Sequence, residues 1–528
     1  MDIAQEKIEF RKKDFKRGID MDESRRKRGE ESIRIRKNRR EEILQKRRRR
    51  GVDNNDNIDI TDNPNNHEPP IDMDVIQHVY STTPETALYG LVKTRKLLSG
   101  EDPLILQVVR SGVVPKLVEY LSYSNYPKHQ YEAAWALTNI VSAESEISRV
   151  TIENSNIGPA MIKLIESHDI DVRDQAIWCL SNIAGECVEY RDKLLESNCL
   201  DKIISILDFE IGYEKRRIKS IRTLTWTMNN LLRGNPPPPF SLMLQTIPVI
   251  KRLYEECWDE ETLTDAGFCL TYISDASSDD QLNMLFRMGV ITKTWLDQIS
   301  HGKGVGRSIL RTCGNIISGP DNLTQQMLDW GFLKYLPRYM AAYKKEACWI
   351  LSNITAGNRI QIQMVIDAGL IQMVIVLMNT GSWAVKKESI YVVANLVGGG
   401  SKEQIDYLVD CNSIEALCSL LNCEDNKMIE IILGTLHKIL RNGKRVQKFD
   451  YYRDLVEEAS GLDQIEYLQN SNNKKIYKKA VKILERHFEA VPDQVYQIEP
   501  NDQVYQTEPI NQIEPMDQTD GNLGPFNF

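Results

Sequence analysis

Four tryptophans in this 528-residue chain are each followed, four residues later, by an asparagine. Residues four apart lie on the same face of an α-helix, so each indole and its amide would point the same way. An indole face suits the aliphatic stem and the charged head of a lysine or arginine, with a cation–π attraction of about 0.5–2 kcal/mol. An asparagine amide carries a donor and an acceptor and can hold the N–H and C=O of a peptide backbone. The pairs, which together predict a site for an extended Lys/Arg-rich peptide, are Trp135–Asn139, Trp178–Asn182, Trp226–Asn230 and Trp349–Asn353.

The helices that carry these pairs also have an apolar stripe. With about 100° of rotation per residue, Leu137 and Ile140 fall on the side of the helix opposite Trp135. We therefore expect each indole and amide to point away from the core. Stacked helices of this kind would align the pairs into an exposed row, which is typical of an interaction surface.

The Trp–Asn step belongs to a longer period. Variants of it occur at Phe268…Tyr272, Arg311…Asn315 and Tyr391…Asn395, and successive first positions are 43, 48, 42, 43, 38 and 42 residues apart. A second recurring signal is a glycine that opens a helix, at Gly112, Gly289, Gly331 and Gly369. Periods near 40–47 residues in helical sequence are typical of armadillo or HEAT repeats. The sequence predicts an all-α fold, a right-handed superhelical armadillo-repeat solenoid of about ten repeats over residues 75–490.

Charge divides the chain into further segments. Residues 1–50 hold 20 Lys/Arg and 11 Asp/Glu, a net charge of +9, and because the whole chain carries −9 the remaining residues carry −18. Residues 51–74 contain no Lys or Arg and are rich in Asn, Asp and Pro, which predicts a flexible linker. Residues 491–528 contain near-repeats and are predicted to form a disordered tail.

Several functional classes are disfavoured by composition. No apolar run approaches 18 residues, so we expect no membrane insertion. None of the ten cysteines forms a CxxC pair and the seven histidines are scattered, so we expect buried thiols and no metal or other cofactor. The acidic body argues against direct nucleic-acid binding.

Two short motifs suggest other functions but lack the required context. The segment 302–308 resembles a phosphate-binding loop, but the order of its residues is wrong and no strand precedes it, so we interpret it as a loop between repeats. We also interpret Pro236–Pro239 as such a loop, with a PxxP ligand as the alternative. We therefore do not expect an enzyme.

From about residue 11 to 488 the sequence resembles the importin α family of nuclear import adaptors, on its Trp–Asn pairs together with its basic arm. The resemblance implies an adaptor that shuttles between cytoplasm and nucleus. It implies binding of nuclear localisation signals of cargo proteins in a concave groove and binding of importin β by residues 1–50. It also implies release by an exportin for recycling, and it is compatible with contacts to nucleoporins. The residues that match the family's importin-β-binding domain are Arg11, Lys12, Lys13, Phe15, Lys16, Arg25, Arg26, Lys27, Arg28, Arg39 and Arg40.

The same resemblance implies two cargo sites. The major site would consist of Trp135, Asn139, Ser148, Gln175, Trp178, Asn182, Glu186, Trp226, Asn230 and Asp265. The minor site would consist of Arg311, Asn315, Trp349, Asn353, Glu388, Tyr391 and Asn395. Some positions depart from the family pattern, since Ser148 and Glu186 stand where Thr and Asp are usual and Ala143 stands where Gly is usual. Phe268 and Tyr391 replace family tryptophans, which predicts weaker stacking at one edge of the major site and in the minor site.

A basic cluster at the end of the arm has the composition that the groove would select. It consists of Lys46, Arg47, Arg48, Arg49 and Arg50 and is tethered by residues 51–74. We expect this cluster to occupy the groove of its own chain and thereby to inhibit it. An armadillo scaffold of the catenin or vacuolar type is the alternative, and such a scaffold would not need the basic arm.

Overall fold

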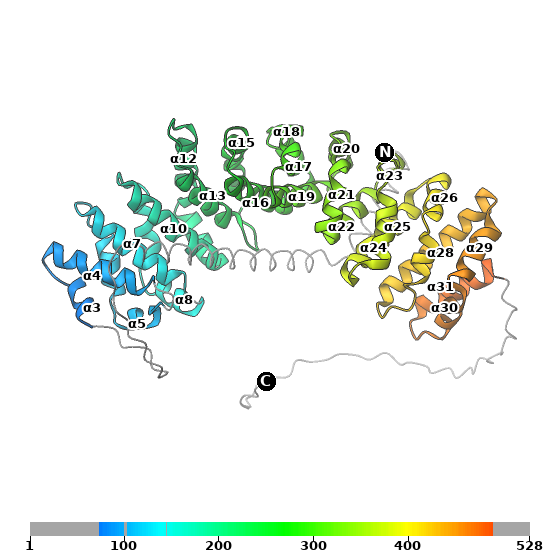
Figure 1. The fold of residues 1–528 in the computed structure, drawn as a ribbon, viewed down its shortest axis with the longest axis horizontal. Helices are drawn as coiled ribbons and strands as arrows, with labels where there is room; N and C mark the ends of the chain where they lie inside the picture. Colours follow the sequence, from blue (N-terminus) through cyan, green and yellow to red (C-terminus); the bar gives the residue numbers. More distant parts are fainter. Residues whose placement is uncertain (1–72, 100–102, 144, 489–528) are drawn as a thin grey trace, which may run out of the picture.

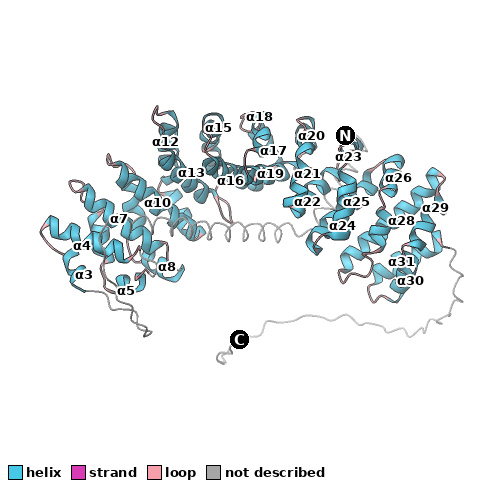
Figure 2. Ribbon diagram, viewed as in Figure 1, coloured by secondary structure: helices cyan, strands magenta, loops and turns pink. Residues whose placement is uncertain are grey.

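The computed structural model describes residues 73–99, 103–143 and 145–488 (Figure 1). Within these ranges every regular element is a helix and there is no strand (Figure 2). The helices follow one another along an arch from α3 to α31. This arrangement confirms the predicted all-α solenoid.

One set of helices forms a continuous inner layer, in which each member packs against the next from α4 to α31. This set consists of α4 (Pro84–Leu97), α7 (Pro127–Val141), α10 (Ile170–Glu186), α13 (Ile218–Leu232), α16 (Glu260–Ala276), α19 (Lys303–Ile317), α22 (Lys344–Thr355), α25 (Trp383–Gly399), α28 (Asn426–Val446) and α31 (Lys474–His487). We call it the inner layer.

The remaining helices precede the inner ones in the chain, mostly as pairs. They are α3 (Met73–Val79), α5 (Ile105–Arg110), α6 (Val114–Tyr120), α8 (Ser145–Glu153), α9 (Ile157–Leu164), α11 (Val188–Glu196), α12 (Cys199–Gly212), α14 (Phe240–Gln245), α15 (Ile247–Glu256), α17 (Asp279–Arg287), α18 (Lys293–Asp297), η1 (Gln298–Ser300), α20 (Asp321–Asp329), η2 (Phe332–Tyr335), α21 (Leu336–Ala342), α23 (Arg359–Asp367), α24 (Leu370–Thr380), α26 (Lys402–Asp410), α27 (Ser413–Cys418), α29 (Phe449–Glu458), α30 (Gly461–Tyr467) and η3 (Leu468–Asn470).

The turn inside most of these pairs contains a left-handed residue, which is why glycine recurs in the sequence; the α8–α9 and α14–α15 turns have none. The residues in this conformation, with φ between 53° and 82°, include Gly112, Gly289, Gly331, Gly369, Asn198, Asn412 and Ser460. Glycine adopts it without a steric penalty and asparagine tolerates it better than most residues. Gly331 and Gly369 directly precede a helix as predicted, whereas Gly112 and Gly289 lie in the turn and the next helices are capped by Val113 and Thr292. Other residues take the place of glycine in three repeats.

The apolar stripes of the inner layer are buried as expected, with Leu137 and Ile140 fully inaccessible. The prediction for segment 302–308 was wrong in part, because α19 begins at Lys303 and most of the segment is its first turns. Pro236–Pro239 does lie in the connection between α13 and α14. Among the described helices none is by itself long and apolar enough to cross a membrane; α23 and α24 pass that test together but are bent by 80° at their junction.

Candidate functional site: a ladder along the inner layer

The solenoid brings the recurring residues of the sequence into one row, which we call the ladder. Its first positions occupy consecutive inner helices: Trp135 on α7, Trp178 on α10, Trp226 on α13, Phe268 on α16, Arg311 on α19, Trp349 on α22 and Tyr391 on α25. Since each of these helices packs against the next, the residues of the predicted major and minor sites lie along one surface.

The indoles of the ladder contact neighbouring groups closely. Trp178 and Trp226 meet edge to face, with ring centroids 5.4 Å apart. The guanidinium of Arg95 lies 4.4 Å from the ring centroid of Trp135, and its Nε donates to Glu132 Oε2 at 2.9 Å. A cation from the chain itself therefore already occupies one indole of the ladder in the way predicted for a ligand cation.

The ladder side chains are less exposed than the sequence predicts. Trp178 is only 6% exposed and Trp349 only 8%, and Asn182 is 1% exposed. The helical wheel considers one helix against one core, whereas here the flanking inner helices cover the ladder side chains from both sides. Since Trp135, Trp226 and Phe268 are half-buried, the ladder is a row of partly covered side chains.

The ladder asparagines connect successive repeats. Asn230 Nδ2 donates to the carbonyl oxygen and the Oγ of Ser181, both at 3.0 Å. Asn139 Nδ2 donates to Ser99 Oγ at 3.0 Å, and Asn182 Nδ2 makes a long 3.5 Å contact with the Thr138 carbonyl. Each of these amides thus donates an N–H to the preceding repeat. The expectation that both the NH2 group and the oxygen of the amide bind a peptide backbone was therefore too simple.

One ladder amide retains an acceptor without a partner. Among the groups that the structure describes, Asn182 Oδ1 is buried and accepts no hydrogen bond. A buried acceptor without a donor costs free energy, which a donor from a ligand would recover.

The remaining residues of the predicted major site are held by the protein itself. Ser148 is fully buried and its Oγ donates to the Val141 carbonyl at 2.9 Å, so in this conformation it offers no surface to a cargo lysine. Glu186 Oε1 lies 3.6 Å from Arg149 Nε. Gln175 Nε2 donates to Thr138 Oγ1 at 2.8 Å.

Asp265 completes the residues expected in the major site. Its carboxylate Oδ1 accepts from Asn229 Nδ2 at 3.2 Å, and the residue is buried. Asn229 precedes the ladder residue Asn230, so the two asparagines on α13 connect to the layers on opposite sides.

The predicted minor site is filled more completely. Arg311 Nε donates to Glu346 Oε1 at 2.7 Å, and both side chains are largely buried. Trp349 packs on Gly314 so closely that a Cβ added to this glycine would collide with the ring. Burial raises the pKa of the Tyr391 hydroxyl, and the nearby carboxylate of Glu388 raises it further.

The minor-site amides differ in their partners. Asn315 Nδ2 donates to Thr271 O at 3.1 Å and Ser274 Oγ at 3.0 Å, and Asn395 Nδ2 donates to Ser352 O at 2.9 Å. Asn353 Nδ2 instead donates at 2.9 Å to the Trp349 carbonyl of its own helix.

Sequence reasoning missed the residues that accept hydrogen bonds from the ladder amides. At Thr138 and Ser352 the main-chain carbonyl is the acceptor, and at Ser181 both the carbonyl and the hydroxyl accept. Thr138, Ser181 and Ser352 each directly precede a ladder asparagine and accept from the next repeat. The recurrence of Ser or Thr at that position is visible in the sequence and was the signal available. No comparable pattern in the sequence predicts that the guanidinium of Arg95 lies over the ring of Trp135.

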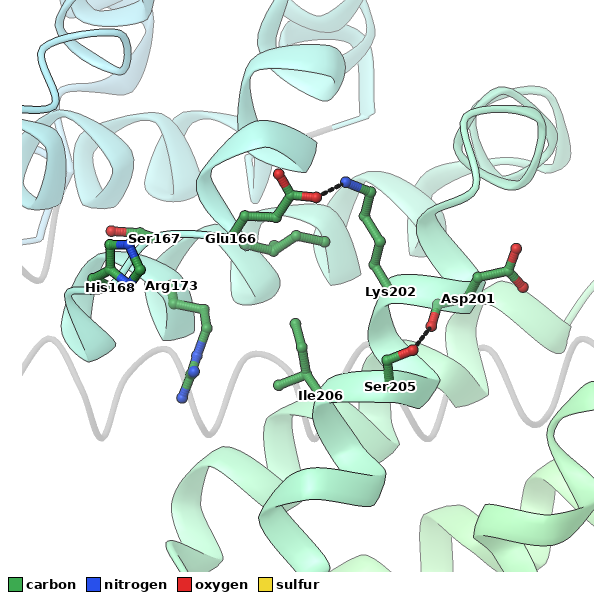
Figure 3. Close-up of a pocket in the computed structure, with 9 residues that line it drawn as sticks. Glu166, Ser167, His168, Arg173, Asp201, Lys202, Ser205 and Ile206 are labelled. Carbon is green, nitrogen blue, oxygen red and sulfur yellow. Dashed lines mark hydrogen bonds and ion pairs between the residues drawn. The ribbon is translucent and has the colours of Figure 1, made fainter.

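A separate pocket of about 510 Å³ lies between α9, α10 and α12 (Figure 3). Lys202 pairs with Glu166 at its rim, and Ser205 Oγ donates to the Asp201 carbonyl at 2.9 Å. None of its lining side chains belongs to the ladder first positions or the ladder asparagines. In the part of the chain that the structure describes, no group of three or more His, Cys, Asp and Glu residues is arranged to hold a metal ion.

The basic arm lies outside the described residues. This includes all the residues predicted to bind importin β, from Arg11 to Arg40, and the predicted inhibitory cluster Lys46–Arg50. Residues 51–72 and 489–528 also lie outside them.

Comparison with known proteins first defines the class. The Armadillo/beta-catenin-like repeat model matches residues 101–142 and 401–441, and the Atypical Arm repeat model matches residues 450–506. The fold resembles an engineered protein of known crystal structure, with a TM-score of 0.67 and 22% identity over 78% of this chain and 97% of that chain. The chain is an armadillo-repeat protein.

The comparison then defines the family. The Importin beta binding domain model matches residues 11–92. Importin subunit alpha-4 of Arabidopsis thaliana is 37% identical over 518 residues, which cover 94% of this chain and 95% of that protein. Importin subunit alpha-1a of Oryza sativa subsp. japonica is 37% identical, with 92% and 93% covered. The chain belongs to the importin α family and is a nuclear import adaptor.

Proposed function

We propose that this chain binds Lys/Arg-rich nuclear localisation signals along its ladder and passes the loaded cargo to importin β through residues 11–50. The observation that carries the groove assignment is the alignment of Trp–Asn pairs on consecutive inner helices. The cation that already rests on Trp135 supports it.

The spacing of the inner layer suits an extended peptide. Alternate residues of an extended chain advance by roughly 7 Å, and packed helices stand about 8–10 Å apart. A concave surface shortens the second distance, so about every second side chain of the peptide meets a new slot. Lysine and arginine stems fill such slots, and their charges lie near the acidic groups of Glu186 and Asp265.

The backbone of the peptide is held by amides. Asn182 Oδ1 accepts a peptide N–H, which satisfies the buried oxygen that has no partner among the described groups. The ladder amides whose Nδ2 makes a single contact, such as Asn139 and Asn182, keep a second N–H for a peptide carbonyl. In these amides one N–H bonds to the neighbouring repeat, and the other N–H and the oxygen bind cargo. Cargo binding is therefore coupled to the packing of the repeats.

The arm provides the connection to importin β and a means of release. A linker of about 25 residues spans roughly 25–30 Å on average, so the cluster Lys46–Arg50 reaches the groove at an effective concentration near millimolar. Importin β competes for the same arm and therefore frees the groove for cargo. Return of the emptied adaptor by an exportin, contacts with nucleoporins and shuttling between cytoplasm and nucleus complete the proposed cycle.

A fluorescence titration tests this function. A labelled Lys/Arg-rich peptide is added to the full chain, to a chain lacking residues 1–60, and to the full chain with Lys46–Arg50 changed to alanine. We expect tighter binding to both altered chains, and we expect added salt to narrow the difference. Equal affinities for all three chains would disprove inhibition by the arm, and no binding to any of them would disprove the groove.

A further inference from the structure

The ladder changes its chemistry at the C-terminal end of the inner layer. Each ladder asparagine directly precedes two buried residues of its helix, and in every case except Ile354 and Thr355 after Asn353 both are apolar, as Leu396 and Val397 are after Asn395 on α25. On α28 the residue in front of the corresponding pair, Ile439 and Leu440, is Lys438. On α31, Lys482 precedes Ile483 and Leu484. The last two inner helices therefore have cations at the position where the helices from α7 to α25 have amides, apart from Tyr272 on α16.

Further cations gather around these two positions from both helices. They form what we call the basic end: Lys438, Arg441 and Lys444 on α28, and Lys475, Lys479, Lys482 and Arg486 on α31. Residues three and four apart share a helix face, so each set lies along one face. Lys444 Nζ donates at 3.0 Å to the Arg486 carbonyl, which joins the two sets.

The centre of the basic end is a pair of histidines. His487 Nε2 and His437 Nδ1 are 3.0 Å apart and share a hydrogen bond. Burial, the largest cause, and the surrounding cations together lower the pKa of both rings to about 4; Arg486 acts on both rings and Lys482 on His437. The positive charge at neutral pH is therefore that of the lysines and arginines.

Few carboxylates on α28 and α31 themselves offset this charge. Glu430 and Glu485 are the acidic residues on α28 and α31. Lys479 Nζ donates at 2.7 Å to the main-chain carbonyl of Glu430, and its pKa is lowered chiefly by burial. Most of the other members of the basic end are exposed, among them Arg441 and Lys482. A surface of this kind attracts an acidic, extended chain.

The chain itself contains such a segment, and it starts where the basic end stops. Residues 489–528 contain eight Asp/Glu and no Lys or Arg. They follow directly on α31, which ends at His487 and carries part of the basic end. We propose that this acidic tail docks on the basic end of its own chain. The basic end thus binds an acidic segment, whereas the ladder beside it binds a Lys/Arg-rich peptide.

Covalent connection favours this occupant over a separate partner. A segment attached a few residues away has an effective concentration in the millimolar range, so weak charge pairs suffice to hold it. The docked tail neutralises a cationic surface beside the minor site and keeps other polyanions away from the groove. Cargo binding at the ladder does not depend on this contact, so the two proposals fail separately.

Carbodiimide cross-linking of the full-length chain tests the docking, because this reagent joins carboxylates directly to lysines. We expect tail carboxylates to link to Lys438, Lys475 and Lys482 roughly 10-fold more often than to the exposed control lysines Lys215 and Lys219. Mixing isotope-labelled and unlabelled chains separates links within a chain from links between chains. Links spread evenly over exposed lysines, or formed only between chains, would overturn the proposal.

A competition experiment supplies an independent test. In the tail-neutral variant of the full chain, Asp493→Asn, Glu499→Gln, Asp502→Asn and Glu508→Gln remove four tail charges and alter no described residue. A labelled peptide of residues 489–520 should bind this variant roughly 10-fold more tightly than the unchanged chain, because the basic end is vacated. Adding Lys438→Glu and Lys482→Glu should abolish the gain, whereas Lys215→Glu and Lys219→Glu should leave it.

The competition experiment also distinguishes the tail from other occupants of the basic end. Equal peptide affinity for the unchanged and tail-neutral chains would overturn tail docking. Single-stranded DNA that binds the basic end equally well in both chains would do the same, since it would show that the tail does not occupy the surface.

Discussion

The two halves of the ladder use the same helix positions in different ways. In the N-terminal half, indoles of adjacent helices meet each other, as Trp178 and Trp226 do at 5.4 Å, and the amides reach back to the preceding repeat. In the C-terminal half, Arg311 takes the place of an indole and pairs with Glu346, while Trp349 packs on Gly314. In the first half the indoles contact one another or Arg95, whereas in the second half the corresponding positions hold a largely buried ion pair and an indole packed on Gly314.

Among the amides the contrast concerns one residue of each half, because Asn315 and Asn395 bond to the preceding repeat as Asn139 and Asn230 do. Asn182 has a long contact to the preceding repeat and a carbonyl oxygen with no partner among the described groups. Asn353 bonds within its own helix. A peptide therefore gains more by entering the N-terminal half, which is the physical reason to expect a stronger major site.

The largest effect is expected from Trp178→Ala combined with Asn182→Ala. The change removes one slot and one backbone contact, so binding of a Lys/Arg-rich peptide should weaken by about 2–4 kcal/mol. Because Trp178 is 6% exposed and packs on Trp226, the melting temperature should fall as well. Titration and thermal unfolding are measured on the same samples.

A matched single variant separates the two losses. Asn182→Ala removes a weakly bonded side chain, so it should lower affinity while leaving the melting temperature nearly unchanged. If this variant binds as well as the unchanged chain, Asn182 does not contact the peptide and the comparison between the halves loses its basis.

A smaller effect, confined to the C-terminal half, is expected from Gly314→Ala. The added Cβ collides with Trp349, so overpacking should cost about 1–3 kcal/mol of stability and displace the indole. A peptide with a single basic cluster should bind the major site unchanged, whereas a bipartite peptide should lose affinity. These effects are followed by thermal unfolding and by titration with both peptides.

Gly398→Ala on α25 is the matched control, because the nearest atom to its added Cβ is Lys438 Nζ at 3.7 Å, which is ordinary contact. Alanine in an open helical position should be neutral or slightly stabilising. Similar losses in both variants would show that the packing of Trp349 on Gly314 has no special role in the minor site.

The period of the Trp–Asn step was sufficient to predict the solenoid, because a repeat near 42 residues leaves few other helical architectures. The ladder positions were also predictable, since they recur at fixed distances from the core stripe. The burial of Trp178 was not, because it depends on the neighbouring helices, which a wheel of one helix omits. The same holds for Arg95 over Trp135, a contact between side chains 40 residues apart.

The smallest effect is expected from Tyr391→Trp, which tests whether the weaker half can be brought closer to the stronger one. Tyr391 is 8% exposed, and it lies near the carboxylates of Glu388 and Asp425, which raise the pKa of its hydroxyl in addition to burial. An indole offers a larger face to a cation beside the same carboxylates, so bipartite peptides should bind more tightly by about 0.5–1 kcal/mol, with single-cluster peptides unaffected. Tyr391→Phe is the control, because it keeps the ring and removes only the hydroxyl, and it should leave bipartite affinity near that of the unchanged chain. The larger indole also has to fit a buried position, so thermal unfolding is recorded to separate overpacking from lost contact. A Tyr391→Trp chain of normal stability with unchanged bipartite affinity would mean that this side chain does not face the ligand, and the minor site would then end at Trp349 and Asn353.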